Sequence, residues 1–433
     1  MKRLLRWSLA VLGVCALLLL ALVVLAGLAI DSQAEAEAPA WPADITPAHI
    51  ERAVRLFILH DPRHLKPGAE DTLRVQAADA DLAINYFAQR AAHTRTRLTL
   101  EAGTARLQTS TRLPRTPLGD HLGIDLRLAQ GDGLPRVAQM RVGRLDVPPL
   151  LANGLFDLGI AQLRATSPAA ARGVDSLRQI DFATAANGGV GIRYVWPGKL
   201  AGAGGFSPWS ATEQARIDAY TRVLGDAAAS DAEAGPLPLA RLMQALLQAA
   251  AVRSDAGGAT AVAENRAALL ALAQFVNAEA LSSLVTALVP AGTPRPITLN
   301  GRTDTAQHFT VSAALTAVAG AEMSDAVGLY KELSDAQGGS GFSFNDLAAD
   351  RAGTRFAARA TAGESGARRQ QRAFMAPTPA SDPGMVLLPS VDDLPEDMQL
   401  AVFIRRFGGV DSPPALRVRA DIERRIGSLP LYR

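Results

Sequence analysis

The chain has 433 residues, of which 48% are hydrophobic, and its 44 basic side chains nearly balance its 42 acidic ones. This length allows two or three domains with a sizeable core. Because the slight excess of positive charge is spread over the whole chain, no basic stripe points to a nucleic-acid partner. The single cysteine excludes a disulfide framework and a cysteine-ligated zinc site.

An uninterrupted apolar run covers residues 8–30, with basic residues before it and acidic residues after it. As a helix that rises about 1.5 Å per residue, the run spans about 34 Å, which is enough to cross a bilayer. The flanking charges predict a cytoplasmic tail over 1–7 and a single transmembrane helix over 8–30. We therefore expect the protein in a bacterial inner membrane, with its N-terminus in the cytoplasm and the bulk of the chain in the periplasm.

A cleaved signal peptide is the alternative interpretation of this segment. Ala34-Glu35-Ala36 fits the small-x-small pattern of a cleavage site. The apolar run, however, is longer than the roughly 7–15 residues of an ordinary signal sequence. An uncleaved anchor is therefore the preferred interpretation.

Residues 31–44 predict a short linker between this anchor and the first folded domain. Thr46-Pro47 is typical of a helix start and Asp61-Pro62 of a helix end, which predicts a helix between them. A second helix is predicted over 79–91, where apolar residues recur among polar ones.

The hydrophobic period then changes from that of a helix to that of a strand. Four segments alternate apolar with polar residues and predict half-buried strands over 97–100, 106–109, 124–128 and 140–145. After a third helix over 148–163, strands over 176–183 and 191–196 predict a hairpin. We therefore expect residues 45–197 to form an α+β domain with one antiparallel sheet and helices on one face.

Residues 198–433 predict a mainly helical domain. Its alanine- and leucine-rich segments carry charged residues on one face and predict amphipathic helices over 212–224, 237–252, 261–276 and 279–288. Near the C-terminus, residues 392–396 predict the start of a helix that Gly408-Gly409 ends, and a last helix is predicted over 414–426.

The densest cluster of unusual polar residues lies within 302–355. His308 follows Asp304 by four positions, which places both side chains on one face of a helix. A carboxylate and an imidazole so close together suit either a metal ion or general-base chemistry.

Further along this cluster, Lys331, Glu332 and Asp335 precede a glycine-rich loop. The loop lacks the lysine and hydroxyl of a phosphate-binding P-loop. Ser343 is placed to cap a helix after the loop, and Asp346 is the acidic half of a capping box.

The same region resembles a small proteobacterial family of predicted periplasmic lipoproteins of unknown function. The resemblance rests on spaced positions: Asp304, His308-Phe309, Ser312, Gly328, Lys331-Glu332, Asp335, Gly341-Phe342-Ser343, Asp346-Leu347 and Gly353. The Asp-x3-His start is also similar, more loosely, to teicoplanin-resistance-type membrane proteins. This chain departs from the lipoprotein pattern by a membrane span in place of a lipidated cysteine. The resemblance implies an envelope location, and no activity can be carried over from a family whose function is unknown.

Two interpretations of the cluster remain open. The functional one has four side chains converge on a divalent metal such as zinc or manganese, or has His308 act as a base: Asp304, His308, Glu332 and Asp335. The structural one has Asp304 and His308 satisfy each other, while Lys331 pairs with Asp335. The structural interpretation is preferred, so no cofactor is predicted. Only the functional interpretation would add a divalent metal.

For two other motifs, a structural explanation is preferred to a functional one. His60 and His64 are four apart, but Pro62 interrupts the helix between them, which favours a solvated loop over a metal site. Arg351, Arg355 and Arg359 line one helical face, which favours a solvated surface over attraction to anionic lipid.

Because no complete catalytic constellation is present, the sequence favours a non-enzymatic envelope protein. Its partners are then the inner membrane and an envelope lipid, glycan or protein. The alternative is a metal-assisted or histidine-dependent hydrolase that acts on an envelope lipid or glycan, in which Lys331, Ser343 and Asp346 are further candidate catalytic residues beside the cluster around His308.

Overall fold

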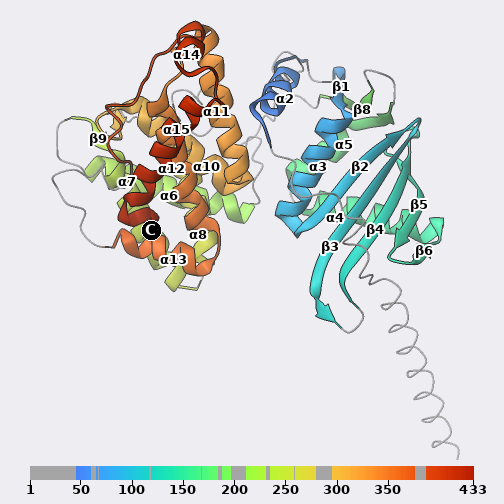
Figure 1. Ribbon diagram of the computed structural model, residues 1–433. Coiled ribbons are helices and arrows are strands. Elements are labelled where there is room, and N and C mark those ends of the chain that lie inside the picture. Colours follow the sequence, from blue (N-terminus) through green and yellow to red (C-terminus); the bar gives the residue numbers. More distant parts are fainter. Residues whose placement is uncertain are drawn as a thin grey trace, which may run out of the picture. The chain divides into compact units, whose positions relative to one another are not determined.

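The computed structural model describes residues 45–59, 65–66, 68–116, 119–166, 168–183, 188–196, 211–230, 235–257, 259–278, 295–375 and 387–433. The chain is a mixed α+β protein with antiparallel sheets, and it divides into two compact units (Figure 1). Of the described residues, those between 55 and 200 form the first unit, and those after 200, together with 45–54, form the second. Five predicted features lie outside the described residues: the tail over 1–7, the segment over 8–30, the linker over 31–44, the His60/His64 pair and the helix over 279–288. Among the helices that are described, none is both long and apolar enough to cross a bilayer.

The first unit contains a five-stranded antiparallel meander in the order β2-β3-β4-β5-β6. The strands are β2 (Thr94–Glu101), β3 (Thr104–Thr116), β4 (Gly119–Ala129), β5 (Arg136–Val142) and β6 (Leu145–Val147). The four predicted alternating segments all fall in this sheet. The last of them, predicted as one strand over 140–145, is divided into β5 and β6 because the chain turns at Gly143, where φ is +56°.

Side chains from two helices form hydrogen bonds with backbone groups of strands in this sheet. The helix α3 (Ala77–Ala92) lies beside the edge strand β2, where Asp81 Oδ1 accepts from Leu98 N at 2.5 Å and Asn85 Oδ1 accepts from Thr96 N at 2.9 Å. On α4 (Pro149–Thr166), Asn153 bonds both the N–H and the carbonyl of Val137 in β5 at 3.0 Å. Asp81 and Asn85 are one helical turn apart, so together they satisfy donors that an edge strand would otherwise expose.

A second antiparallel sheet in this unit corrects the prediction of a single sheet. It has the order β1-β8-β7, with β1 (Glu70–Gln76), β8 (Gly189–Val195) and β7 (Leu177–Phe182). The hairpin of β7 and β8 is as predicted, and it pairs with a strand that lies more than 100 residues earlier in the chain. Local alternation shows where a strand is but not which strand it pairs with, which is why the sequence suggested one sheet. Two further helices are α5 (Pro168–Ser176), in this unit, and α2 (Pro47–Leu59), as predicted, whose residues up to Val54 group with the second unit.

The second unit is built from helices around a continuous apolar core. In chain order they are α6 (Ala211–Ser230), α7 (Leu239–Asp255), α8 (Ala261–Val276), α10 (Thr303–Ala319), α11 (Ala321–Gly338), α12 (Phe344–Thr361), α13 (Glu364–Ala373), α14 (Leu400–Phe407) and α15 (Pro413–Ser428), followed by the 3₁₀ turn η2 (Pro430–Tyr432). Two short strands, β9 (Leu237–Pro238) and β10 (Ile297–Thr298), pair in parallel. The predicted helices over 212–224, 237–252, 261–276 and 414–426 correspond to α6, α7, α8 and α15.

The glycine-rich loop and the segment before α14 pack against each other, which corrects the predicted start of that helix at 392–396. Phe342 and Met398 exchange backbone hydrogen bonds at 2.7 and 3.1 Å, and Phe344 N donates to the carbonyl of Pro395 at 2.9 Å. The loop glycine Gly341 has a φ of +102°, and a Cβ there would lie 2.5 Å from the backbone carbon of Asp397. Met398 and the residues just before it are therefore held against the glycine-rich loop, and α14 begins at Leu400 rather than at the acidic residues.

Candidate site: a buried histidine–carboxylate cluster

The helix α12 is unusual because it is buried on most sides and still carries carboxylates. Asp346 and Asp350 lie on it four residues apart and are 8% and 5% exposed. It packs against α10, which contributes His308, and against α11, which contributes Glu332. Three helices thus bring one imidazole and three carboxylates into the same part of the core.

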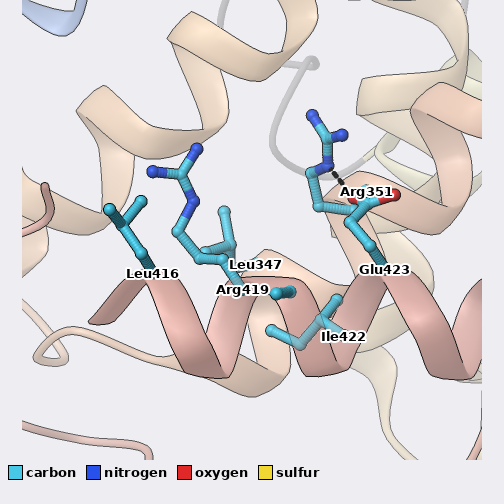
Figure 2. Close-up of a pocket in the computed structure, with 7 residues that line it drawn as sticks. Leu347, Arg351, Leu416, Arg419, Ile422 and Glu423 are labelled. Atoms are coloured by element: carbon cyan, nitrogen blue, oxygen red, sulfur yellow. Dashed lines mark hydrogen bonds and ion pairs between the residues drawn. The ribbon is translucent and has the colours of Figure 1, made fainter. Parts of the chain in front are cut away.

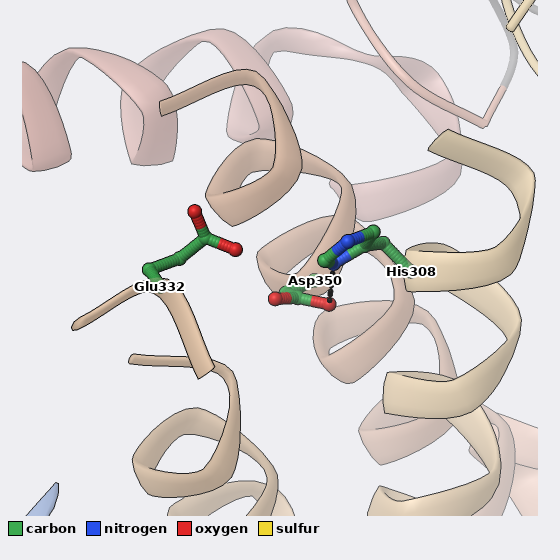
Figure 3. A group of neighbouring side chains, drawn as sticks. All are labelled: His308, Glu332 and Asp350. Atoms are coloured by element: carbon green, nitrogen blue, oxygen red, sulfur yellow. Dashed lines mark hydrogen bonds and ion pairs between the residues drawn. The ribbon is translucent and has the colours of Figure 1, made fainter. Parts of the chain in front are cut away.

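His308 lies between the two aspartates of α12. Its Nδ1 is 3.1 Å from Asp350 Oδ1, and its Nε2 is 3.5 Å from Asp346 Oδ2. One ligand atom each from His308, Glu332 and Asp350 lie within 4.8 Å of one another. Figure 3 shows the Glu332 carboxylate pointing from its own helix toward the Asp350–His308 pair.

The cluster is enclosed, and its carboxylates are incompletely paired. The side chain of Glu332 is 0% exposed, and those of His308 and Asp350 are 9% and 7% exposed. One oxygen of each carboxylate accepts no hydrogen bond from the described residues: Glu332 Oε1, Asp346 Oδ1 and Asp350 Oδ2. Burying an anionic oxygen without a hydrogen-bond donor costs free energy. A bound proton or cation would remove this cost.

A glycine on α11 makes room for the cluster. A Cβ at Gly328 would lie 2.8 Å from Asp350 Oδ2, one of the unpaired oxygens. Glycine at this position therefore allows α11 to approach α12 closely enough for Glu332 and Asp350 to share one site.

The environment raises the pKa of both His308 and Glu332. Burial by itself lowers the pKa of His308, but the hydrogen bond with Asp350 and the negative charges of Asp350 and Asp346 outweigh it and raise the pKa from 6.5 to about 8. Burial raises the pKa of Glu332 from 4.5 to about 8, against the opposing hydrogen bond from Ser343 N. Burial also raises the pKa of Asp346. Without a metal, the folded cluster therefore holds protons on His308 and Glu332 at neutral pH.

This proton uptake predicts that the metal-free protein loses stability as pH rises. A folded-state pKa above the unfolded value gives stabilisation that is complete below the unfolded pKa, 6.5 for His308 and 4.5 for Glu332, and that disappears as pH passes through about 8. Since one pKa unit corresponds to about 1.4 kcal/mol, we expect the melting temperature to fall by about 5–10 °C between pH 6 and pH 9. Thermal unfolding followed by circular dichroism in chelator-treated buffers measures this. Glu332→Gln, which does not titrate, should flatten the profile, and an unchanged slope in that variant would contradict the assignment.

Two of the four predicted convergent residues lie outside the cluster. Both oxygens of Asp304 are taken by Arg302, at 3.1 Å from Nε and 2.7 Å from Nη2, so Asp304 does not pair with His308 as the structural interpretation proposed. Asp335 accepts from Lys331 Nζ at 2.7 Å, and this predicted pair is confirmed. Both carboxylate oxygens of Asp304 accept hydrogen bonds from Arg302. His308 therefore contacts the aspartates of α12 instead.

The predicted helix cap at Ser343 is confirmed, with a different reciprocal partner. Ser343 Oγ accepts from Asp346 N at 3.1 Å, as a capping residue does. The backbone N–H of Ser343 donates to Glu332 Oε2 at 2.8 Å instead of to Asp346. The carboxylate of Asp346 is thereby released from the cap and faces His308.

Asp350 and Ser312 are the site residues that sequence reasoning missed. Asp350 accepts from Ser312 Oγ at 2.7 Å on the same oxygen that contacts His308. The signal for Asp350 was its spacing of four from Asp346 on a helix that Ser343 was expected to cap, which places both aspartates on one face. Ser312 donates its hydrogen bond to Asp350, so it is a positioning residue for that carboxylate rather than a nucleophile activated by His308.

The arginine face of α12 is not a solvated surface, which corrects that prediction. Arg351 pairs with Asp325 and Glu423, Arg355 contacts Glu423, and Arg359 donates to the carbonyl of Arg433. These contacts attach α15 and the C-terminus to α12. Figure 2 shows the pocket of about 230 Å³ between α12 and α15, whose apolar wall includes Leu347, Leu416 and Ile422. Its lining contains none of the cluster residues.

The fold and the cluster together define a mixed α+β protein with a histidine–carboxylate site in a helical unit. No family model matches the chain, and neither the curated proteins nor the solved structures contain a significant match to it.

Proposed function

We propose that this chain is a membrane-anchored envelope protein whose helical unit binds one divalent metal ion through His308, Glu332 and Asp350, with Asp346 beside them. The observation that carries the proposal is the convergence of three ligand atoms from three helices within 4.8 Å, at buried carboxylates that each have one oxygen without a hydrogen bond from the described residues. A divalent cation supplies the positive charge that these oxygens lack.

The ligand set indicates the class of metal. One imidazole with two or three carboxylates suits zinc or manganese, whereas calcium and magnesium prefer oxygen ligands alone. The Nζ of Lys331 is 3.7 Å from Glu332 Oε1, so the positive charge of Lys331 competes with a metal ion for this carboxylate. Its side chain is 47% exposed, so it can turn toward solvent when the ion enters.

Because the cluster is enclosed, a structural role for the ion is better supported than a catalytic one. Each ligand comes from a different helix, so the ion ties α10, α11 and α12 together. A hydrolytic metal needs an open coordination position that substrate reaches, and a site with a fully buried glutamate supports this alternative less well. We therefore propose a non-enzymatic binding or scaffolding protein of the envelope. Its placement at the inner membrane rests on the apolar run over 8–30 and its flanking charges.

Thermal melts of the full chain in neutral detergent test the metal proposal. At a free metal concentration 100 times the Kd, binding to the folded state adds about 2.7 kcal/mol. We expect zinc or manganese to raise the melting temperature by about 5–10 °C and magnesium to have little effect. The shift should disappear in Glu332→Gln and persist in the control Asp335→Asn. An equal shift in wild type and Glu332→Gln would place the ion elsewhere, and no shift at all would refute the proposal.

A further inference from the structure

A second polar site lies on α6, where this helix meets the end of α7 and the start of α8. A groove of about 740 Å³ there is lined by three arginines: Arg216, Arg222 and Arg253. Ala215 and Ala219 line the same groove, and their small side chains leave it room along α6. None of the groove residues belongs to the histidine–carboxylate cluster.

A buried carboxylate holds two of these arginines in place. Glu264 is 2% exposed and accepts from Arg216 Nε at 3.1 Å, from Arg253 Nε at 2.8 Å and from Tyr220 Oη at 2.6 Å. Arg253 also lies over the ring of Tyr220, 5.4 Å from its centroid. Both contacts to Glu264 use Nε, so this carboxylate does not engage the Nη donors of either guanidinium. The two cations are thus fixed side by side before any ligand arrives.

The charges of the groove do not cancel. Three arginines against the single carboxylate of Glu264 give 3 − 1 = 2 positive charges. Tyr220 adds no negative charge, because burial and its hydrogen bond to Glu264 raise its pKa. The neighbouring carboxylate of Asp255 is engaged by Arg368 at 2.6 Å. Ala211 and Thr212, the first residues of α6, also line the groove, and Glu213 of the same first turn is not among its lining residues.

We propose that this groove binds a phosphate group with two negative charges. Guanidinium groups bind phosphate oxygens through paired, charge-assisted hydrogen bonds, and two arginines that are already ordered lose little entropy on binding. The phosphate comes either from a lipid headgroup or from a free phosphate compound, and both present the same oxygens to the arginines.

Titration calorimetry on the full chain in neutral detergent tests this site and separates the two sources. Metal is first removed by dialysis, so that phosphate cannot bind through an ion at the cluster. The two probes are inorganic phosphate and a short-chain phosphatidic acid, with short-chain phosphatidylcholine as the zwitterionic comparison of zero net charge. Arg222→Gln is the main variant, because this exposed arginine does not hold Glu264 and its loss leaves the buried network intact. Arg405→Gln on α14 removes the same charge from another exposed helix and is the matched control.

We expect saturable binding of phosphate that weakens about tenfold in Arg222→Gln and stays unchanged in Arg405→Gln. Arg253→Gln should weaken it further if circular dichroism shows the variant folded. Much tighter binding of phosphatidic acid than of inorganic phosphate supports the lipid source, and similar binding of both supports free phosphate. Absence of saturable heat with both probes would overturn the proposal, as would equal losses in Arg222→Gln and Arg405→Gln.

Discussion

Gly353→Ala is expected to destabilise the helical unit by about 3–5 kcal/mol or to prevent its folding. A Cβ at this position of α12 would lie 2.1 Å from the carbonyl oxygen of Phe309 in α10. The oxygen is part of the α10 backbone and the Cβ is fixed directly to the α12 backbone, so the clash is relieved only if α10 and α12 move apart. Urea unfolding followed by circular dichroism measures the loss.

The matched control for this substitution is Gly225→Ala. Gly225 lies within α6, and an added Cβ there meets nothing within 4 Å. Alanine should therefore be neutral or stabilise the protein by up to about 1 kcal/mol, because it restricts the unfolded chain. If both variants lost the same stability, the close approach of α10 and α12 would not be what holds this unit together.

The second large effect is expected for metal affinity. Asp350→Asn should raise the Kd for zinc or manganese at least 100-fold, or about 2.7 kcal/mol, because it removes a charged ligand and the partner of His308 together. Competition with a chromophoric chelator measures the Kd. Ser312→Ala, which removes only the 2.7 Å bond that orients Asp350, should raise the Kd about tenfold.

Asp335→Asn is the control for both variants. It removes one carboxylate from α11, where Asp335 pairs with the exposed Lys331 outside the cluster. Its Kd should stay within about threefold of wild type, since this exposed pair contributes little. A loss as large as that of Asp350→Asn would mean that general negative charge, rather than the cluster, attracts the ion.

The sequence located the cluster region and named three of its four members, with Asp346 as a candidate catalytic residue and Asp350 missed. His308 and Glu332 were among the predicted metal ligands, and the structure brings them together. Asp304 was predicted from its spacing to His308, but the contact with Arg302 two residues earlier takes both of its oxygens. Spacing on one helix shows which side chains share a face, whereas the partner across a helix pair depends on tertiary packing.

The same limit explains the errors in the fold. The alternating segments and the helix starts were predicted well, because hydrophobic period and capping residues act locally. The second sheet depends on β1 meeting β8, and the late start of α14 depends on Met398 pairing with Phe342. Each is a contact between segments far apart in the chain, which local patterns do not encode.

The most direct measurement is X-ray absorption at the zinc edge of the full chain after dialysis against zinc. We expect one zinc per chain, with oxygen and nitrogen ligands at about 2.0–2.2 Å and the scattering pattern of a single imidazole. That pattern should be lost in His308→Gln. Zinc bound without an imidazole, zinc bound by several of the chain's six histidines, or no retained zinc would contradict a metal site at His308, Glu332 and Asp350.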